Sequence, residues 1–115
     1  DQRSVAEIMG ELRQHVTAAR TGSLKASWMT GATITVTNLG DHGADVVHGV
    51  ISPPEVALVG IGRPAERPWV VDDGSVAVRR IVTVTLAADH RATDGASGSR
   101  FLRTVADLLE HPEEL

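Results

Sequence analysis

An alternating stretch near the C-terminal end of the chain leads into a short polar segment and then into an amphipathic helix. In residues 82–88, Val and Leu alternate with Thr, which is the period of a half-buried β-strand. The polar segment, residues 89–95, reads DHRATDG. This order of patterns predicts a strand, then a loop, then a helix. It places His90 at the end of a rigid strand, where the scaffold can direct the side chain at a substrate.

The histidine carries most of the chemical information in this segment. Histidine titrates near neutral pH, so His90 can remove a proton and return it within one reaction cycle. Asp94 and Gly95 complete the pattern H-x-x-x-D-G. From spacing alone, an ordinary strand-end histidine with satisfied hydrogen bonds is the favoured interpretation. A metal site is disfavoured, because two ligands need a third, and neither a cysteine cluster nor an H-E-x-x-H sequence supplies one.

The remaining sequence predicts further helices and strands. A helix is predicted over residues 4–21, where Ser4 and Glu7 form a capping box. Strands are predicted at residues 32–38, 55–62, 69–71 and 76–88. The DDGS run at residues 72–75 indicates a hairpin, and Asp94 can cap the last helix. This order of elements predicts an α+β domain with a mixed or mostly antiparallel sheet.

Composition narrows the classes of function. The 115 residues suffice for one domain with a core and not for two. A net charge of −4, without any basic run, argues against a nucleic-acid partner. The chain lacks cysteine, which excludes disulfides and thiolate metal sites. No apolar stretch approaches the roughly 20 residues of a membrane helix, so no membrane association is expected.

Two other patterns have alternative interpretations. Gly60 and Gly62 form a G-x-G pair that could hold a phosphate. Without a third glycine and a following helix, close packing against the predicted strand is favoured. Four residues of the irregular 40–54 segment could form a second metal site, although ordinary loop polarity is the favoured interpretation. These residues are Asp41, His42, Asp45 and His48.

Three segments in order resemble one known family. TITVTNLG (33–40), SPPEVALVGIG (52–62) and DHRATDGASGSRFL (89–102) resemble the catalytic domain of dihydrolipoamide acyltransferases, the core component of 2-oxo acid dehydrogenase complexes. The resemblance covers essentially all of residues 1–115, but only the C-terminal half of that domain. It implies a chloramphenicol-acetyltransferase-like two-layer sandwich, with a mixed or antiparallel sheet and helices on one face. We expect the chain to be part of a longer polypeptide.

The resemblance implies an enzyme that moves an acyl group, branched-chain or acetyl, from S-acyl-dihydrolipoyl-lysine to coenzyme A. His90 matches the catalytic histidine, which acts as general base on the coenzyme A thiol and then as acid for the leaving sulfur. Thr37 matches a serine that stabilises the oxyanion, and Asn38 lies beside it in the substrate-binding segment. The threonine is a departure, because it keeps the hydroxyl but adds a methyl group and restricts χ1.

Asp94 matches the motif aspartate and is the third candidate catalytic residue. Pairing with an arginine that holds the loop is favoured for it over orienting the histidine. Two further residues match the structural part of the motif. Arg91 matches as a possible ion-pair partner, and Gly95 as a residue that permits close packing.

The resemblance also implies partners. It predicts a homotrimer whose active site lies between subunits, with Thr37 and His90 from different chains, and a cubic or dodecahedral core built from trimers. An acylated lipoyl domain would carry the lipoyl-lysine. The 2-oxo acid decarboxylase and dihydrolipoamide dehydrogenase components would bind through an upstream domain. The bacterial cytoplasm is favoured over the mitochondrial matrix. Residues 1–115 alone are expected to be inactive. The alternative is a non-catalytic module that only assembles the core.

Overall fold

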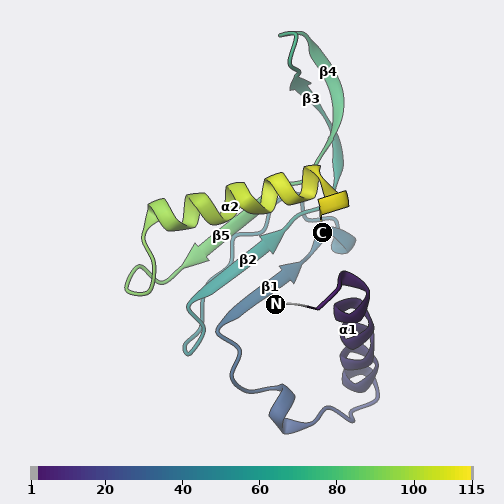
Figure 1. Ribbon diagram of the computed structural model, residues 1–115, viewed down its shortest axis with the longest axis vertical. Coiled ribbons are helices and arrows are strands. Elements are labelled where there is room, and N and C mark those ends of the chain that lie inside the picture. The colour runs from purple at the N-terminus through teal and green to yellow at the C-terminus, as the bar shows by residue number, and fades with distance from the viewer. Residues whose placement is uncertain (1–2, 115) are drawn as a thin grey trace. The chain divides into compact units, whose positions relative to one another are not determined.

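A three-stranded mixed sheet carries the candidate site. The computed structural model describes residues 3–114. Its sheet contains β1 (Ile34–Asn38), β2 (Ala57–Ile61) and β5 (Val84–Ala88) in the order β1-β2-β5. β1 and β2 are parallel, whereas β2 and β5 are antiparallel (Figure 1). The prediction of an α+β fold with a mixed sheet is therefore confirmed.

Helix α2 (Gly95–Glu110) covers one face of this sheet with its first turns. Ala88 pairs with Ala57 at one end of the sheet, and Leu86 lies on the same face two residues earlier. A Cβ atom added at Gly98 of α2 would lie 3.3 Å from Leu86 Cδ2. The helix backbone therefore approaches the sheet closely at this glycine.

A loop at residues 44–50 covers the opposite face. The Thr85 hydroxyl donates a hydrogen bond to the Val47 carbonyl oxygen. A Cβ at Gly60 would lie 2.8 Å from that same oxygen, and one at Gly62 would lie 2.0 Å from another carbonyl oxygen of the loop. The two glycines therefore allow close backbone packing, as favoured above, and are not arranged around an open cradle.

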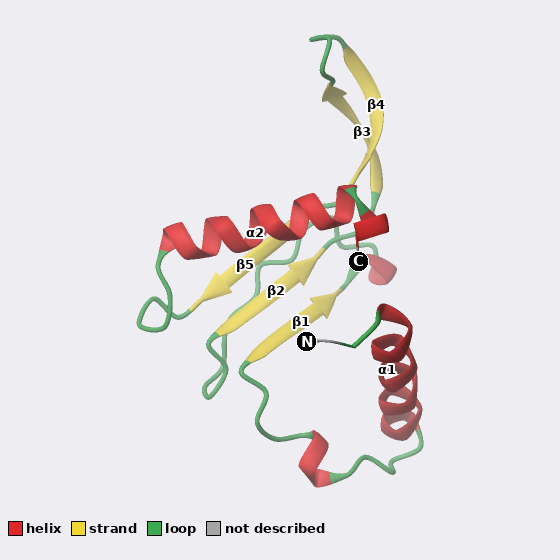
Figure 2. Ribbon diagram, viewed as in Figure 1, coloured by secondary structure: helices red, strands yellow, loops and turns green. Residues whose placement is uncertain are grey.

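The strands β3 (Ala65–Val70) and β4 (Val76–Ile81) form a separate antiparallel hairpin (Figure 2). The hairpin signal at residues 72–75 is confirmed, with Gly74 at a φ of 80° in the turn. The predicted first strand, residues 69–71, is too short, because Pro68 lies inside β3. A two-stranded ribbon leaves one edge of each strand unpaired, so it tolerates the missing proline N–H.

The single return strand predicted at residues 76–88 is wrong. The chain leaves β4 at Ile81 and enters β5 at Val84, so two residues separate the strands. Each strand pairs with a different partner, since β4 pairs with β3 and β5 with β2. The alternation of β-branched residues continues through this break, and the sequence pattern therefore gave no sign of it.

The chain divides into two compact units, which are residues 3–32 with 104–114, and residues 33–103. In the first unit, α1 (Val5–Arg20) begins with the predicted capping box. The Glu7 N–H donates to Ser4 Oγ at 3.3 Å, and the Ser4 N–H donates to Glu7 Oε2 at 2.8 Å. A short 3-10 helix, Ala26–Trp28, follows. Neither α1 nor α2 has the length and hydropathy of a membrane-spanning helix.

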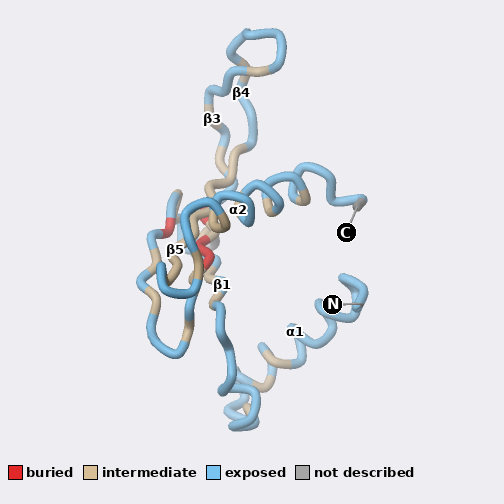
Figure 3. Tube along the Cα trace, turned by 60° about the vertical axis from the view of Figure 1, so that its left-hand side comes forward, coloured by how far each residue is buried: buried red, intermediate tan, exposed pale blue. Residues whose placement is uncertain are grey.

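Few apolar side chains are buried. Among residues 3–114, the buried hydrophobic side chains are Val47, 8% exposed, and Val59, 5% exposed (Figure 3). Other large apolar residues are well exposed, such as Val36 on β1 at 64% and Val76 on β4 at 69%. The described residues therefore leave much apolar surface uncovered.

Candidate active site

The turn between β5 and α2 holds His90 at the edge of the sheet. The turn starts at Asp89, directly after β5, and residues 90–92 form its bend. His90 is exposed. Its imidazole makes no hydrogen bond with any residue that the structure describes. Both ring nitrogens are therefore available to a bound molecule, which argues against an internally satisfied strand-end histidine.

A groove of about 240 Å³ lies beside His90. Apolar atoms of Leu86, Ala88 and Leu102 line it, and Asp94 and Ser99 contribute polar atoms. The groove runs between the end of β5 and the first turns of α2. Its mixed lining suits a ligand that carries one reactive polar group on an aliphatic arm.

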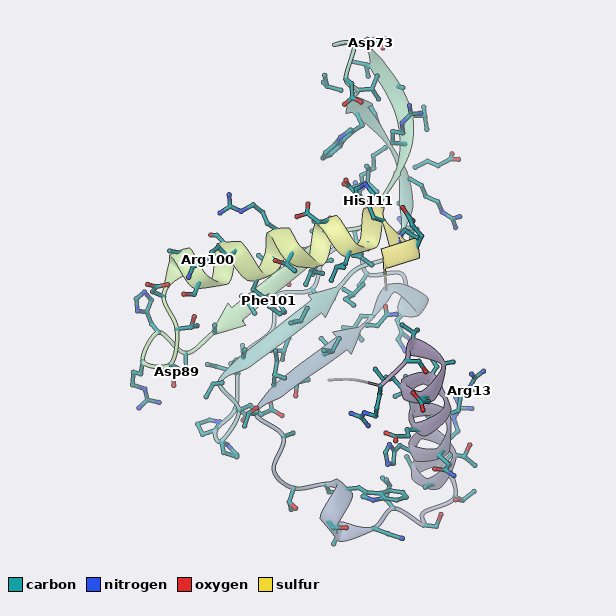
Figure 4. All side chains as sticks on the ribbon, viewed as in Figure 1. Arg13, Asp73, Asp89, Arg100, Phe101 and His111 are labelled. Atoms are coloured by element: carbon teal, nitrogen blue, oxygen red, sulfur yellow. The ribbon has the colours of Figure 1, made fainter. Side chains whose placement is uncertain are left out.

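A second groove of about 210 Å³ shares part of this lining. Leu86, Ala88 and Gly98 border both grooves. The second groove is more apolar, and its lining includes Ile34 of β1 and Phe101 of α2. Phe101 is labelled in Figure 4. The exposed turn that carries His90 therefore adjoins two neighbouring grooves with a shared apolar lining.

Asp94 caps α2 and does not contact the histidine in the described structure. Its Oδ1 accepts a hydrogen bond from the Ser97 N–H at 2.8 Å, as a helix N-cap does. The backbone amide and the side chain of Ser97 together lower the pKa of Asp94 below its ordinary value. The prediction that Asp94 caps the last helix is confirmed.

The expected ion pair between Asp94 and an arginine is absent among residues 3–114. Arg91 instead binds Asp89, with Nη2 2.7 Å from Oδ2. The Arg91 guanidinium, together with the Arg91 backbone amide, lowers the pKa of Asp89 to about 2. Arg91 pairs with the carboxylate of Asp89 and not with that of Asp94, because Asp89 and Arg91 lie on the same tight turn.

Gly95 does not provide the expected close packing within this chain. A Cβ added there would meet no described atom within 4 Å. The close approach of α2 to the sheet occurs three residues later, at Gly98. One helical turn separates the two positions, and the sequence pattern alone does not distinguish them.

Thr37 lies on β1, far from His90. Its side chain is half-buried, and its hydroxyl makes no hydrogen bond within the described part of the chain. The hydroxyl of Thr35, on the same face, is occupied, since it donates to Glu55 Oε1 at 2.6 Å. Asn38 accepts the Gly40 N–H with Oδ1 at 2.9 Å. Of the two threonines, Thr37 therefore has the hydroxyl that is free to donate.

The described candidate ligands of the possible second metal site, His42, Asp45 and His48, do not form a metal-binding group with one another. Asp45 binds Arg63 and, at 3.0 Å, Arg67. The two guanidiniums, Arg63 first, lower the pKa of the Asp45 carboxyl. The side chain of Asp41 lies outside the described residues. Among the side chains that the structure describes, no three of His, Asp or Glu lie close enough to hold a metal ion.

Sequence reasoning missed the role of Asp89. The residue was part of the motif but had no assigned function. An Asp at the end of a strand is typical of an Asx turn, in which the carboxylate accepts the amide two residues on. That local pattern would have indicated the turn, although not the contact with the Arg91 guanidinium.

Comparisons with known proteins agree with one another. The profile of the family described as "2-oxoacid dehydrogenases acyltransferase (catalytic domain)" matches residues 1–115. A Staphylococcus aureus protein, the dihydrolipoyllysine-residue acetyltransferase component of the pyruvate dehydrogenase complex, is 39% identical over 115 residues. The match covers 100% of this chain and 26% of that protein, so the chain spans about a quarter of its length.

Two solved structures are also similar. Dihydrolipoamide acetyltransferase from Azotobacter vinelandii superimposes with a TM-score of 0.85 and 33% identity, over 95% of this chain and 44% of that one. Its catalytic mechanism has been investigated at a serine, a histidine and an asparagine. The cubic core of a pyruvate dehydrogenase multienzyme complex gives a TM-score of 0.85 and 32% identity, over 95% and 44%. These similarities confirm the predicted fold class.

Proposed function

Because this chain belongs to the family of 2-oxoacid dehydrogenase acyltransferase catalytic domains, we propose that its protein transfers an acyl group from S-acyl-dihydrolipoyl-lysine to coenzyme A. The observation that carries the proposal is the free imidazole of His90, exposed beside a partly apolar groove. A thioester on an aliphatic arm combines the polar and apolar chemistry that this groove offers.

In the proposed reaction, His90 takes the proton of the coenzyme A thiol as the sulfur attacks the thioester carbonyl. A free thiol has a pKa of about 8.5 and is mostly protonated at neutral pH, so it needs a base. The carbonyl π bond opens, and the negative charge collects on oxygen. When the C–S bond to the dihydrolipoyl group breaks, His90 returns the proton to the departing sulfur. Such a group supplies roughly 100- to 10,000-fold in rate.

The Thr37 hydroxyl of a second copy is proposed to stabilise the oxyanion. Its hydrogen-bonding capacity is unused within residues 3–114, and Asn38 beside it is exposed. In one copy Thr37 lies on β1, whereas His90 lies in the turn after β5, at the opposite end of the sheet. A site that uses both residues therefore needs two copies, as a trimer would supply.

Asp94 is proposed to cap the start of α2 and not to act on the histidine. In the Azotobacter relative, the investigated asparagine lies four positions after the histidine, which is the spacing of Asp94 from His90. An asparagine can cap a helix as Asp94 does here, but it cannot act as a carboxylate. The match supports a capping role.

We propose acetyl as the acyl group, with a branched-chain acyl group as the alternative. The Staphylococcus relative is an acetyltransferase of a pyruvate dehydrogenase complex, which supports acetyl. The remaining partners follow from the same family: an acylated lipoyl domain, a 2-oxo acid decarboxylase, dihydrolipoamide dehydrogenase and further copies of this chain. A cubic core is supported by the similar solved core. We place the protein in the bacterial cytoplasm.

A second candidate function is assembly without catalysis. The large amount of exposed apolar surface, including Val36 and Val76, favours extensive contacts with other polypeptide. Such contacts are needed in either case, because an intersubunit site also depends on them. The free imidazole at His90 favours the enzyme.

The test compares the whole polypeptide that carries this sequence with its His90→Ala variant, using acetyl-dihydrolipoamide and coenzyme A. We expect His90→Ala to lower kcat by roughly 100- to 10,000-fold while assembly is retained. His111→Ala is the matched control, because His111 is also exposed but lies at the end of α2. Equal rates for wild type and His90→Ala would refute the catalytic assignment. An assembled wild-type protein without any transfer would favour the assembly module.

A further inference from the structure

Asp89 anchors the backbone of the turn that carries His90. The Asp89 N–H donates to the Val56 carbonyl oxygen at 2.8 Å, which ties the start of the turn to the segment before β2. The Asp89 carbonyl oxygen accepts the N–H groups of Ala92 at 2.9 Å and Thr93 at 3.1 Å. Both ends of the turn are therefore fixed through one residue.

The Asp89 side chain fixes the residue on the other side of the histidine. Its Oδ1 accepts the Arg91 N–H at 2.9 Å. The Arg91 guanidinium returns to the same carboxylate, with Nε 3.0 Å from Oδ1 and Nη2 2.7 Å from Oδ2. Arg91 lowers the pKa of Asp89 to about 2, so the carboxylate stays ionised well below neutral pH. In the chain, His90 lies between these two connected residues, and Figure 4 labels Asp89 at this turn.

No side-chain hydrogen bond orients His90 itself. The imidazole has no hydrogen-bond partner among residues 3–114, and Asp94 is occupied by the start of α2. The position of the ring nitrogens therefore depends on the backbone of the turn. A displacement of about 1 Å in such a group can cost about 100-fold in rate.

We propose that Asp89, together with Arg91, is the positioning pair for His90, so that the carboxylate before the histidine and not Asp94 sets the geometry of the base. The inference rests on the proposed acyl transfer. The Asp89 side chain is 19% exposed and that of Arg91 is 86% exposed. A pair this open to solvent contributes little to global stability, so its effect should appear in the geometry of the turn.

The first test measures kcat and KM for acyl transfer in the whole polypeptide. We expect Asp89→Ala to lower kcat by roughly 10- to 100-fold with KM for coenzyme A changed by less than about threefold. Asp89→Asn keeps an oxygen that can accept the Arg91 N–H, and we expect it to recover most of the lost rate. Arg91→Lys keeps the charge but not the two-point contact, so we expect an intermediate loss. An unchanged kcat in Asp89→Ala would overturn the proposal.

A double-variant cycle separates positioning from a general structural effect. If Asp89 acts through His90, adding Asp89→Ala to His90→Ala should not lower the residual rate further. A merely structural role would lower it in both backgrounds by the same factor, and that result would overturn the proposal.

A measurement independent of activity separates this inference from the proposed function. Amide hydrogen exchange should be at least about tenfold faster at Arg91 in Asp89→Ala, while amides of β2 keep their protection. Exchange unchanged at Arg91 would refute the anchoring role even if acyl transfer is demonstrated. If wild type transfers no acyl group, the proposed function fails, and the exchange result still decides whether Asp89 holds the turn.

Discussion

Thr37 and His90 lie at opposite ends of the β1-β2-β5 sheet and are directed to opposite faces. Thr37 is in register with Gly60 and, through it, with Thr85. These positions face the loop at residues 44–50, whereas the groove beside His90 lies on the α2 side. Two strand spacings lie between β1 and β5, about 10 Å, and five residues lead along the chain from Thr85 to His90, about 17 Å in extended form. One copy therefore cannot bring both residues to one thioester.

We predict that two inactive variants restore each other when they assemble together. When Thr37→Val and His90→Ala are co-expressed, some interfaces between copies combine an intact Thr37 from one copy with an intact His90 from the other. Random mixing should recover about a quarter of wild-type sites, measured as the rate of acyl transfer per active site. Each variant alone should be at least about 100-fold slower than wild type.

A mixture of wild type with the double variant Thr37→Val/His90→Ala is the control. If the site lies between copies, this mixture also retains about a quarter of the sites, because both contributing chains must be wild type. If one copy contributed both residues, about half of the sites would remain, and the first mixture would be inactive. That pair of results would contradict an intersubunit site.

Asp94 should tolerate replacement by asparagine better than by alanine. Asp94→Asn retains an oxygen for the Ser97 N–H, so α2 keeps its N-cap. Asp94→Ala leaves that amide without its partner, and we expect the unfolding midpoint to fall by on the order of 5 °C. Thermal unfolding and kcat measured on both variants check this. If asparagine proved as harmful to kcat as alanine, the carboxylate itself would be required.

The sequence correctly predicted helix caps and turns, which are determined by a few neighbouring residues. The capping box at Ser4, the cap at Asp94 and the hairpin turn at Gly74 each depend on a few neighbouring residues, and all three are present. The break between β4 and β5 and the strand position of Pro68 depend on which strands pair. Pairing is a property of the whole sheet, so the alternation of residues could not reveal it.

In the candidate site, too, the sequence predicted features set by neighbouring residues and not those set by the folded geometry. The sequence identified His90 because its motif joins a strand to a helix. It did not identify Asp89 as the partner of Arg91, since the choice between Asp89 and Asp94 depends on the geometry of a turn. Nor could it show that Thr37 has a free hydroxyl while that of Thr35 is bound.

The ion pair between Asp89 and Arg91 should become weaker in acid. The folded-state pKa of Asp89 is lowered from 3.8 to about 2 by Arg91. Any stability that this ion pair contributes is therefore fully present above about pH 4 and is lost as the pH falls toward 2. We expect a small difference in unfolding midpoint between wild type and Arg91→Ala that is constant from pH 7 to 5 and disappears near pH 2. A difference that grows as the pH falls would contradict the pairing.

Gly62 should not tolerate even a methyl group. A Cβ there would lie 2.0 Å from the Asp45 carbonyl oxygen, and Asp45 is itself held by Arg63 and Arg67. The loop cannot move away without breaking these contacts, so we expect Gly62→Ala to lower the free energy of unfolding by about 1–3 kcal/mol. Gly10→Ala is the matched control, because a Cβ at Gly10 of α1 meets nothing within 4 Å. That variant should gain about 0.5–1 kcal/mol. Chemical denaturation of both variants measures the contrast, and a neutral Gly62→Ala would show that the loop does not pack against the end of β2.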